Sequence, residues 1–164
     1  GCTVHGFDPT PKAVAYVKGL QPPGFVLHEL GVAAHKGRTT FHLPNNDAHV
    51  SGTLAPAGHT GNRTIDVELV DLDDVFALTG ARNLAVLKLD IEGAEFDVIA
   101  DASFARHAPH IGVLCLELHH RWPEHGRAAA DAVVNRLRDL GFECVWAQTT
   151  SNEEFTFVNR RPVN

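Results

Sequence analysis

The sequence of 164 residues contains no methionine and only three cysteines. Because it opens at Gly1, directly before a strand-like segment, we expect an upstream segment in the complete protein. The cysteines are odd in number and form no Cys-x-x-Cys pair, which argues against a disulfide framework or a structural zinc site. Cys115 and Cys144 lie in apolar runs, so they are expected to be buried thiols, and this usage suits a reducing cytoplasm.

Long apolar runs and concentrated positive charge are also missing. No run approaches the roughly 20 apolar residues of a membrane helix, so no membrane association is expected. The 14 basic residues are outnumbered by 20 acidic ones, which gives a formal net charge of -6. Nucleic-acid binding needs a concentrated basic face, and the longest basic run here is Arg160-Arg161. A small neutral or cationic molecule is therefore the expected partner, and homo-oligomer formation stays open.

Apolar periodicity and turn residues predict a single domain over residues 1–164, in which strands alternate with helices. Near-continuous apolar runs at 84–90 and 111–118 are typical of interior parallel strands, whereas 64–70 alternates as an edge or half-exposed strand does. We therefore expect an α/β fold with a mainly parallel sheet. Further strands are predicted at 2–7, 25–34 and 37–43, helices at 11–19, 71–80, 94–102 and 127–140, and an antiparallel hairpin at 142–147 and 154–158.

One long loop is predicted at 44–62, where glycine, proline, asparagine and histidine are frequent. Loops of this length in compact domains are often functional. This one is expected to form part of a substrate wall or a lid.

Polar side chains follow the predicted strands at the edge where open α/β sheets bind ligands. The first strand ends at Asp8. A carboxylate there commonly accepts hydrogen bonds from ribose hydroxyls, although a plain turn or helix-capping aspartate is an equally good interpretation. Nicotinamide enzymes carry the same feature, so Asp8 alone does not identify a cofactor.

The segment 88–95 carries more specific information. Asp90 and Glu92 are close carboxylates at a strand end. Their negative charges repel one another unless a ligand or another partner interacts with them. Gly93 allows a tight turn into the next helix, and Glu95 lies in the first helical turn, where its negative charge is favourable and its role is expected to be structural.

The neighbouring strand ends in Glu117, His119 and His120. Histidine accepts protons near neutral pH, so His119 is a candidate general base, although 11 histidines make such a pair unremarkable. A metal held by Asp90, Glu117 and His119 is a less favoured alternative, and no metal site is expected.

Three segments carry a family resemblance. Leu87–Phe96 (LKLDIEGAEF) resembles the lysine-isoleucine-aspartate-valine-glutamate-glycine-alanine-glutamate signature of the FkbM family of methyltransferases. Gly6–Pro11 is similar to that family's acidic-proline step after its second strand, and Val70–Val75 to its threonine-leucine-aspartate segment. Their order and spacing agree with the family over residues 4 to about 120.

The resemblance implies a Rossmann-like class I methyltransferase fold that uses S-adenosylmethionine to methylate a hydroxyl on a sugar, a polyketide or a similar small metabolite. It places Asp8 and Pro9 at the cofactor ribose and Val32 and Ala33 beside adenine. Asp90 would face the methyl group, and Asp90 or His119 would remove the hydroxyl proton. The residues expected to bind the acceptor are Glu92, Glu117 and His120.

One family element has no counterpart here. The glycine-rich loop and first βα unit, which hold the methionine part of the cofactor, do not occur in this sequence. Either they lie upstream, or strands 2–7 and 84–90 pair directly. The alternatives to an active methyltransferase are a truncated non-catalytic module that binds a partner or serves as a scaffold, and a nicotinamide oxidoreductase with an upstream GxGxxG loop.

Overall fold

The computed structural model describes residues 1–45, 52–54, 60–122 and 125–163. The chain divides into two compact units, residues 1–70 and residues 71–164. Among the described residues, no helix is long and apolar enough to cross a membrane. Most of the predicted loop at 44–62 lies outside the described residues, so its expected role as a wall or lid stays a prediction.

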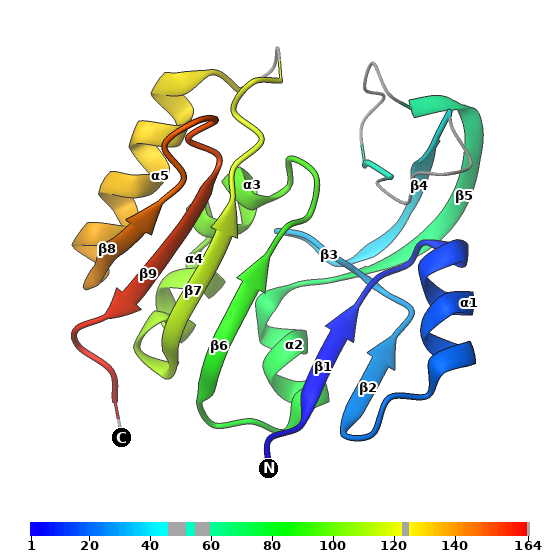
Figure 1. Ribbon diagram of the computed structural model, residues 1–164, viewed down its shortest axis with the longest axis horizontal. Coiled ribbons are helices and arrows are strands. Elements are labelled where there is room, and N and C mark those ends of the chain that lie inside the picture. Colours follow the sequence, from blue (N-terminus) through cyan, green and yellow to red (C-terminus); the bar gives the residue numbers. More distant parts are fainter. Residues whose placement is uncertain (46–51, 55–59, 123–124, 164) are drawn as a thin grey trace. The chain divides into compact units, whose positions relative to one another are not determined.

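The first unit contains two small sheets (Figure 1). Its elements are β1 (Val4–Phe7), α1 (Pro11–Leu20), β2 (Phe25–His28), β3 (Gly31–Val32), β4 (Gly37–Pro44) and β5 (Thr60–Val70). Strands β1 and β2 pair in parallel, and the second sheet has the order β3-β5-β4. The predicted strand 25–34 is therefore divided into β2 and β3. Strand β5 begins earlier than predicted and is the central strand of its sheet, not an edge strand. Its residues 64–69 alternate between exposed and more buried positions, as the half-exposed alternative predicted.

Helix α1 begins as its sequence predicts, with Pro11 in the first turn and Thr10 at the N-cap position. The Thr10 side chain makes no capping hydrogen bond. Instead, Asp8 Oδ1 accepts a hydrogen bond of 2.7 Å from the Thr10 backbone N–H. The turn after β1 is thus closed by Asp8, which the sequence favoured equally as a turn residue and as a ligand.

The core of the second sheet fixes how closely β3 approaches its neighbours. Ala33, Phe41, Val67 and Leu69 form this core. Gly31 has no side chain, and a Cβ there would lie 2.6 Å from the Leu69 side chain and 3.7 Å from Pro9 Cγ. Glycine at this position therefore allows β3 to lie close against the Leu69 side chain of β5, whereas the distance to Pro9, at the end of β1, is an ordinary contact.

The second unit contains a mixed sheet of order β6-β7-β9-β8 (Figure 1). Its elements are α2 (Leu72–Thr79), β6 (Leu84–Leu89), α3 (Glu95–Ala100), α4 (Ala102–His107), η1 (Ala108–His110), β7 (Ile111–Glu117), α5 (Arg127–Asp139), β8 (Phe142–Ala147) and β9 (Glu154–Asn159). Strands β6 and β7 are parallel, and β8 and β9 form the predicted antiparallel hairpin.

The expectation of two interior parallel strands holds for β7 alone. Strand β6 is the edge strand of its sheet, and Val86 is 58% exposed. Among the described residues, β1 pairs with β2 and β6 pairs with β7. The alternative in which β1 and β6 pair directly stays a prediction. In the part of the chain that the structure describes, the β1-β2 sheet is parallel and the other two sheets are mixed, because β4, β8 and β9 run antiparallel to their neighbours.

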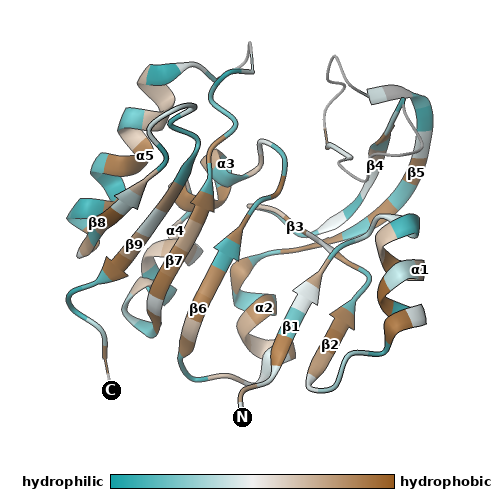
Figure 2. Cartoon of the chain, in the orientation of Figure 1, coloured by the Kyte–Doolittle hydropathy of each residue, from teal (hydrophilic) through white to brown (hydrophobic). Residues whose placement is uncertain are grey.

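Local signals placed α2 and α5 of this unit well. Asp71 caps α2 by accepting from the Asp74 N–H, and Gly80 ends it in a left-handed conformation. Helix α5 buries Ala130, Val133 and Leu137, and Figure 2 shows the alternation of hydrophilic and hydrophobic residues along it. The predicted helix 94–102 is instead two helices, because Asp101 is extended and caps α4 by accepting from the Ser103 N–H.

The cysteine prediction was wrong in one respect. None of the three cysteines forms a disulfide, but Cys115 is only half-buried and Cys144 is exposed. Cys144 lies on the edge strand β8, where residues 143–146 are all exposed. An apolar run on an edge strand therefore did not indicate burial.

Candidate active site

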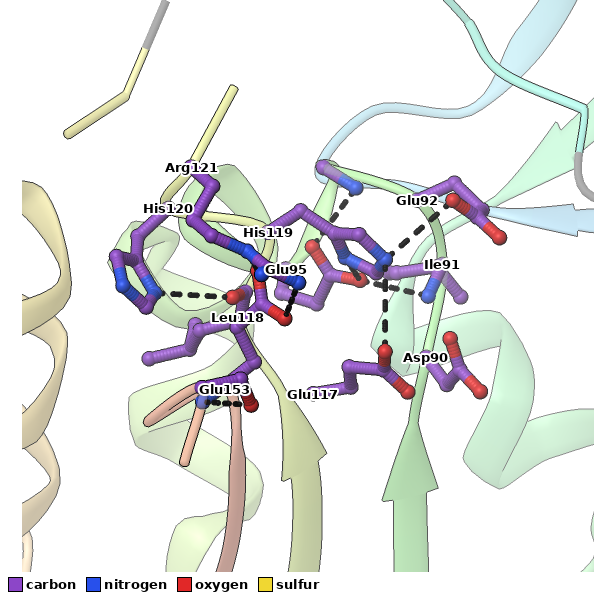
Figure 3. A network of polar contacts seen from close by, with 12 residues as sticks. Asp90, Ile91, Glu92, Glu95, Glu117, Leu118, His119, His120, Arg121 and Glu153 are labelled. Carbon is purple, nitrogen blue, oxygen red and sulfur yellow. Dashed lines mark hydrogen bonds and ion pairs between the residues drawn. The ribbon is translucent and has the colours of Figure 1, made fainter. Parts of the chain in front are cut away.

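Polar side chains gather at the carboxyl ends of β6 and β7 in the second unit (Figure 3). We call Asp90, Glu92, Glu117 and His119 the strand-end cluster. Because β6 and β7 are parallel neighbours, their carboxyl ends meet at one edge of the sheet. The structure thus brings together the residues predicted from these two strands, with the exception of His120.

The turn from β6 into α3 is held by Glu95, which is fully buried. Its Oε1 accepts a hydrogen bond of 2.7 Å from the Ile91 N–H, and its Oε2 accepts one of 2.9 Å from the Gly93 N–H. Glu92 lies between these donors with a φ of 54°, a left-handed conformation that is uncommon for a residue with a side chain. The buried carboxylate thus stabilises a turn that presents Glu92 at the strand end.

His119 lies at the centre of the cluster and is buried. Its Nδ1 lies 3.1 Å from Glu95 Oε1. Its Nε2 lies 3.3 Å from Glu92 Oε2 and 3.9 Å from Glu117 Oε1. One ring nitrogen therefore faces the interior of the turn and the other faces the carboxylates of the cluster (Figure 3).

The surrounding charges set the proton affinities in the cluster. Burial lowers the pKa of His119, but the hydrogen bond to Glu95 and the charges of Glu95, Glu92 and Glu117 outweigh burial, so its pKa is raised. The pKa of Glu117 is also raised, first by burial and then by the negative charge of Asp90. A histidine of raised pKa is a stronger base once it is neutral.

Asp90 stands at the exposed side of the cluster. Lys88 Nζ lies 2.9 Å from Asp90 Oδ2, and this hydrogen bond is the main cause that raises the pKa of Lys88. Asp90, Glu92 and His119 each offer one ligand atom within 4.8 Å of the others, a spacing at which a cation fits. The less favoured metal site considered from the sequence had Glu117 where this group has Glu92. Asp90 and Glu92 each have a cationic or protonatable neighbour already, so spacing alone does not define a metal centre.

His120 is placed differently from its predicted role. It is buried, and its Nδ1 lies 3.2 Å from the Leu118 carbonyl oxygen, away from the cluster (Figure 3). The residues on either side of it are held to Glu153, which directly precedes β9: Arg121 makes a bidentate ion pair with the Glu153 side chain, and the Leu118 N–H donates to the Glu153 carbonyl. This connection fixes where β7 ends and hence where His119 lies.

Sequence reasoning missed the aromatic side of the cluster. The Trp122 and His119 rings have centroids 4.9 Å apart, and Phe96 stacks on His125 at 4.0 Å. A Cβ on Gly93 would lie 2.9 Å from the indole of Trp122. The available signal was the position of Trp122, three residues after His119 at the same strand end.

The remaining predicted ligand residues lie in the first unit. Asp8 is half-buried at the end of β1, and its N–H donates to the His28 carbonyl at the end of β2. Pro9 packs beside Gly31, and Val32 is half-buried at the end of β3. Ala33 is buried in the core and is 5% exposed, so its side chain does not lie at the surface.

The fold and the strand-end cluster define an α/β protein with acidic and basic groups at the ligand-binding edge of a sheet. Residues 1–144 match the Methyltransferase FkbM domain, and the chain belongs to this family. The chain is 30% identical over 109 residues to the 2-O-methyltransferase NoeI of Sinorhizobium fredii (strain NBRC 101917 / NGR234). The matched region is 57% of this chain and 45% of that relative, so the chain spans less than half of the relative's length. No solved structure matches the chain.

Proposed function

We propose that this chain carries out S-adenosylmethionine-dependent O-methylation of a small molecule as part of a complete methyltransferase, and that its strands belong to one Rossmann-like domain. The family and the 2-O-methyltransferase relative support this class of reaction. The observation that carries the proposal is the position of His119 Nε2 among the carboxylates of Glu92 and Glu117 at a strand edge. An alcohol held there meets a base and two hydrogen-bond acceptors.

The first unit offers groups that suit the nucleoside part of the cofactor. Ribose presents hydroxyl donors, and the half-buried Asp8 carboxylate presents acceptors at the end of β1. Pro9 and Val32 supply apolar surface at the ends of β1 and β3, which suits an adenine ring. Ala33 would contribute through its backbone position, because its side chain packs in the core. When bound, S-adenosylmethionine supplies an electrophilic methyl group on a sulfonium.

The strand-end cluster would act on the acceptor alcohol. Glu92 and Glu117 accept its hydrogen bonds and orient its oxygen, and Asp90 lines the exposed side. Neutral His119 takes the hydroxyl proton on Nε2 as the new O–CH3 bond forms and the S–CH3 bond breaks, which leaves S-adenosylhomocysteine and an imidazolium. Orientation of the two reactants is worth about 7–11 kcal/mol in such displacements. His120 would act by supporting this segment, since it does not face the cluster.

The acceptor class follows from charge and family together. The net charge of -6 disfavours a nucleic acid, and the carboxylates of the cluster suit hydroxyl donors of a sugar or polyketide.

The cysteines bear on where the reaction takes place. The three cysteines form no disulfide, which is typical of proteins in a reducing cytoplasm. We therefore propose that the reaction takes place in the cytoplasm.

Titration calorimetry with S-adenosylhomocysteine tests the proposal on both residues 1–164 and the complete protein. We expect micromolar binding by the complete protein and at least tenfold weaker binding by its Asp8→Asn variant. Asp97→Asn, an exposed change on α3, is the matched control and should bind as the unmodified protein does. If the complete protein binds no S-adenosylhomocysteine, the proposal fails and the non-catalytic binding or scaffold module becomes the better interpretation.

A further inference from the structure

Glu95 is a charged residue in a position where charge is costly. Its exposed fraction is 0%, although it lies in the first turn of a helix of six residues. An exposed acid in a first turn contributes about 0.3–1 kcal/mol through the helix dipole. Burial of a carboxylate costs more than that unless hydrogen bonds compensate it. The helix dipole therefore does not account for a glutamate here.

The hydrogen bonds of Glu95 explain how its burial is tolerated. The backbone N–H groups of Ile91 and Gly93 bond one oxygen each, and His119 Nδ1 lies 3.1 Å from Oε1 (Figure 3). Two backbone donors already close the turn. A third donor from a histidine on the next strand adds a connection that the turn itself does not need.

This third contact determines which nitrogen of His119 carries the proton. Both oxygens of Glu95 accept hydrogen bonds from backbone donors, so Oε1 is an acceptor toward His119 as well. Nδ1 is then the donor, and in the neutral ring the lone pair lies on Nε2. Nε2 is the nitrogen that faces Glu92 and Glu117 in the strand-end cluster.

We propose that Glu95 is a positioning residue that holds His119 in the tautomer protonated on Nδ1 and so makes Nε2 the proton acceptor in methyl transfer. This inference rests on the proposed function. Glu95 does not touch the acceptor, because it lies on the interior side of the imidazole. Its role parallels that of the buried aspartate in serine proteases, where exchange of the carboxylate for an amide keeps the geometry, reverses the tautomer and lowers kcat about 10⁴-fold.

The tautomer is measured directly by long-range ¹H–¹⁵N correlation spectra of the complete protein with ¹⁵N-labelled histidine. His119→Asn identifies the signal, and the spectra are recorded at a pH where the ring is neutral. We expect unmodified His119 to be protonated on Nδ1 and Glu95→Gln to lose this preference. A neutral His119 protonated on Nε2 in the unmodified protein overturns the inference, and this result does not depend on whether Glu95→Gln folds.

Methyl-transfer kinetics provide the second readout. Glu95→Gln should lower kcat by between about 10²- and 10⁴-fold while KM for the acceptor stays within about threefold, since the substrate contacts remain. Asp97→Asn, two residues further along α3 and exposed, should leave both constants unchanged. An unchanged kcat in a folded Glu95→Gln protein overturns the inference. If the tautomer is as expected but no alcohol is methylated, the proposed function fails instead, and the use of Nε2 as a base fails with it.

Discussion

Trp122 packs against Gly93 so closely that a Cβ on the glycine would lie 2.9 Å from Cζ3 of the indole. The φ of Gly93 is 97°, which residues with a side chain rarely adopt. The contact joins the turn after β6 to the segment after β7. The two halves of the strand-end cluster therefore depend on one glycine.

Gly93→Ala should destabilise the protein and displace Trp122. Gly141 has the same φ of 97°, but the atoms nearest to a Cβ there belong to the flexible side chain of Arg161, at 3.2 Å and beyond. Gly141→Ala thus measures chiefly the backbone cost, because this side chain can move away. We expect Gly93→Ala to lower the free energy of unfolding by about 1–3 kcal/mol more than Gly141→Ala, in urea titrations followed by tryptophan fluorescence. Equal losses in the two variants would show that the Trp122 contact is not tight.

The pH dependence of methyl transfer should report His119. The base must be neutral, and its raised pKa means that activity rises with pH through a value above the ordinary 6.5. Glu92→Gln removes one of the negative charges that raise this pKa, so the acidic limb of the kcat/KM profile should move to lower pH. A limb that stays in place in this variant would exclude His119 as the titrating base.

Asp73 should stabilise the second unit in a pH-dependent way. Its pKa is lowered by hydrogen bonds from His107 and then Arg106. A lowered carboxyl pKa contributes stability above the unfolded value of about 3.8, and this contribution is lost as pH falls through the folded value. The Asp73 side chain is 44% exposed, so Asp73→Asn should cost no more than about 1 kcal/mol at pH 7 and close to nothing at pH 2. If Asp73→Asn lowers the free energy of unfolding at pH 2 as much as at pH 7, the loss comes from changed packing and not from the charge of Asp73.

Metal removal should leave methyl transfer unchanged. In the strand-end cluster, Lys88 pairs with Asp90, and His119 lies between Glu95 and Glu92, so each of the three candidate ligand residues already has a partner in the protein. Treatment of the complete protein with EDTA is expected to alter kcat by less than about twofold. Loss of activity that Mn²⁺ restores would instead assign Asp90, Glu92 and His119 to a metal.

Much of this structure was predictable because its signals are local. Asp71 and Gly80 mark the ends of α2, and the apolar face of α5 follows from its periodicity. The strand-end cluster was predictable because residues that follow parallel strands meet at one sheet edge, which placed Asp90, Glu92, Glu117 and His119 together.

The remainder depends on contacts between segments distant in the sequence. The burial of Glu95 requires His119, which lies 24 positions away, and a first-turn glutamate looks the same whether or not such a partner exists. The position of His120 depends on a bond to the Leu118 carbonyl and on the neighbouring Arg121–Glu153 pair. The edge position of β6 and the exposure of Cys144 depend on strand order, which apolar runs do not encode.

A crystal structure of the complete protein with S-adenosylhomocysteine tests the central claim most directly. We expect the ribose hydroxyls to bond to Asp8 and the sulfur to face the strand-end cluster, with His119 Nε2 directed toward the acceptor space. Asp8 and Asp90 on opposite sides of the molecule, or a nucleoside bound away from both, would contradict the proposed methyltransferase site.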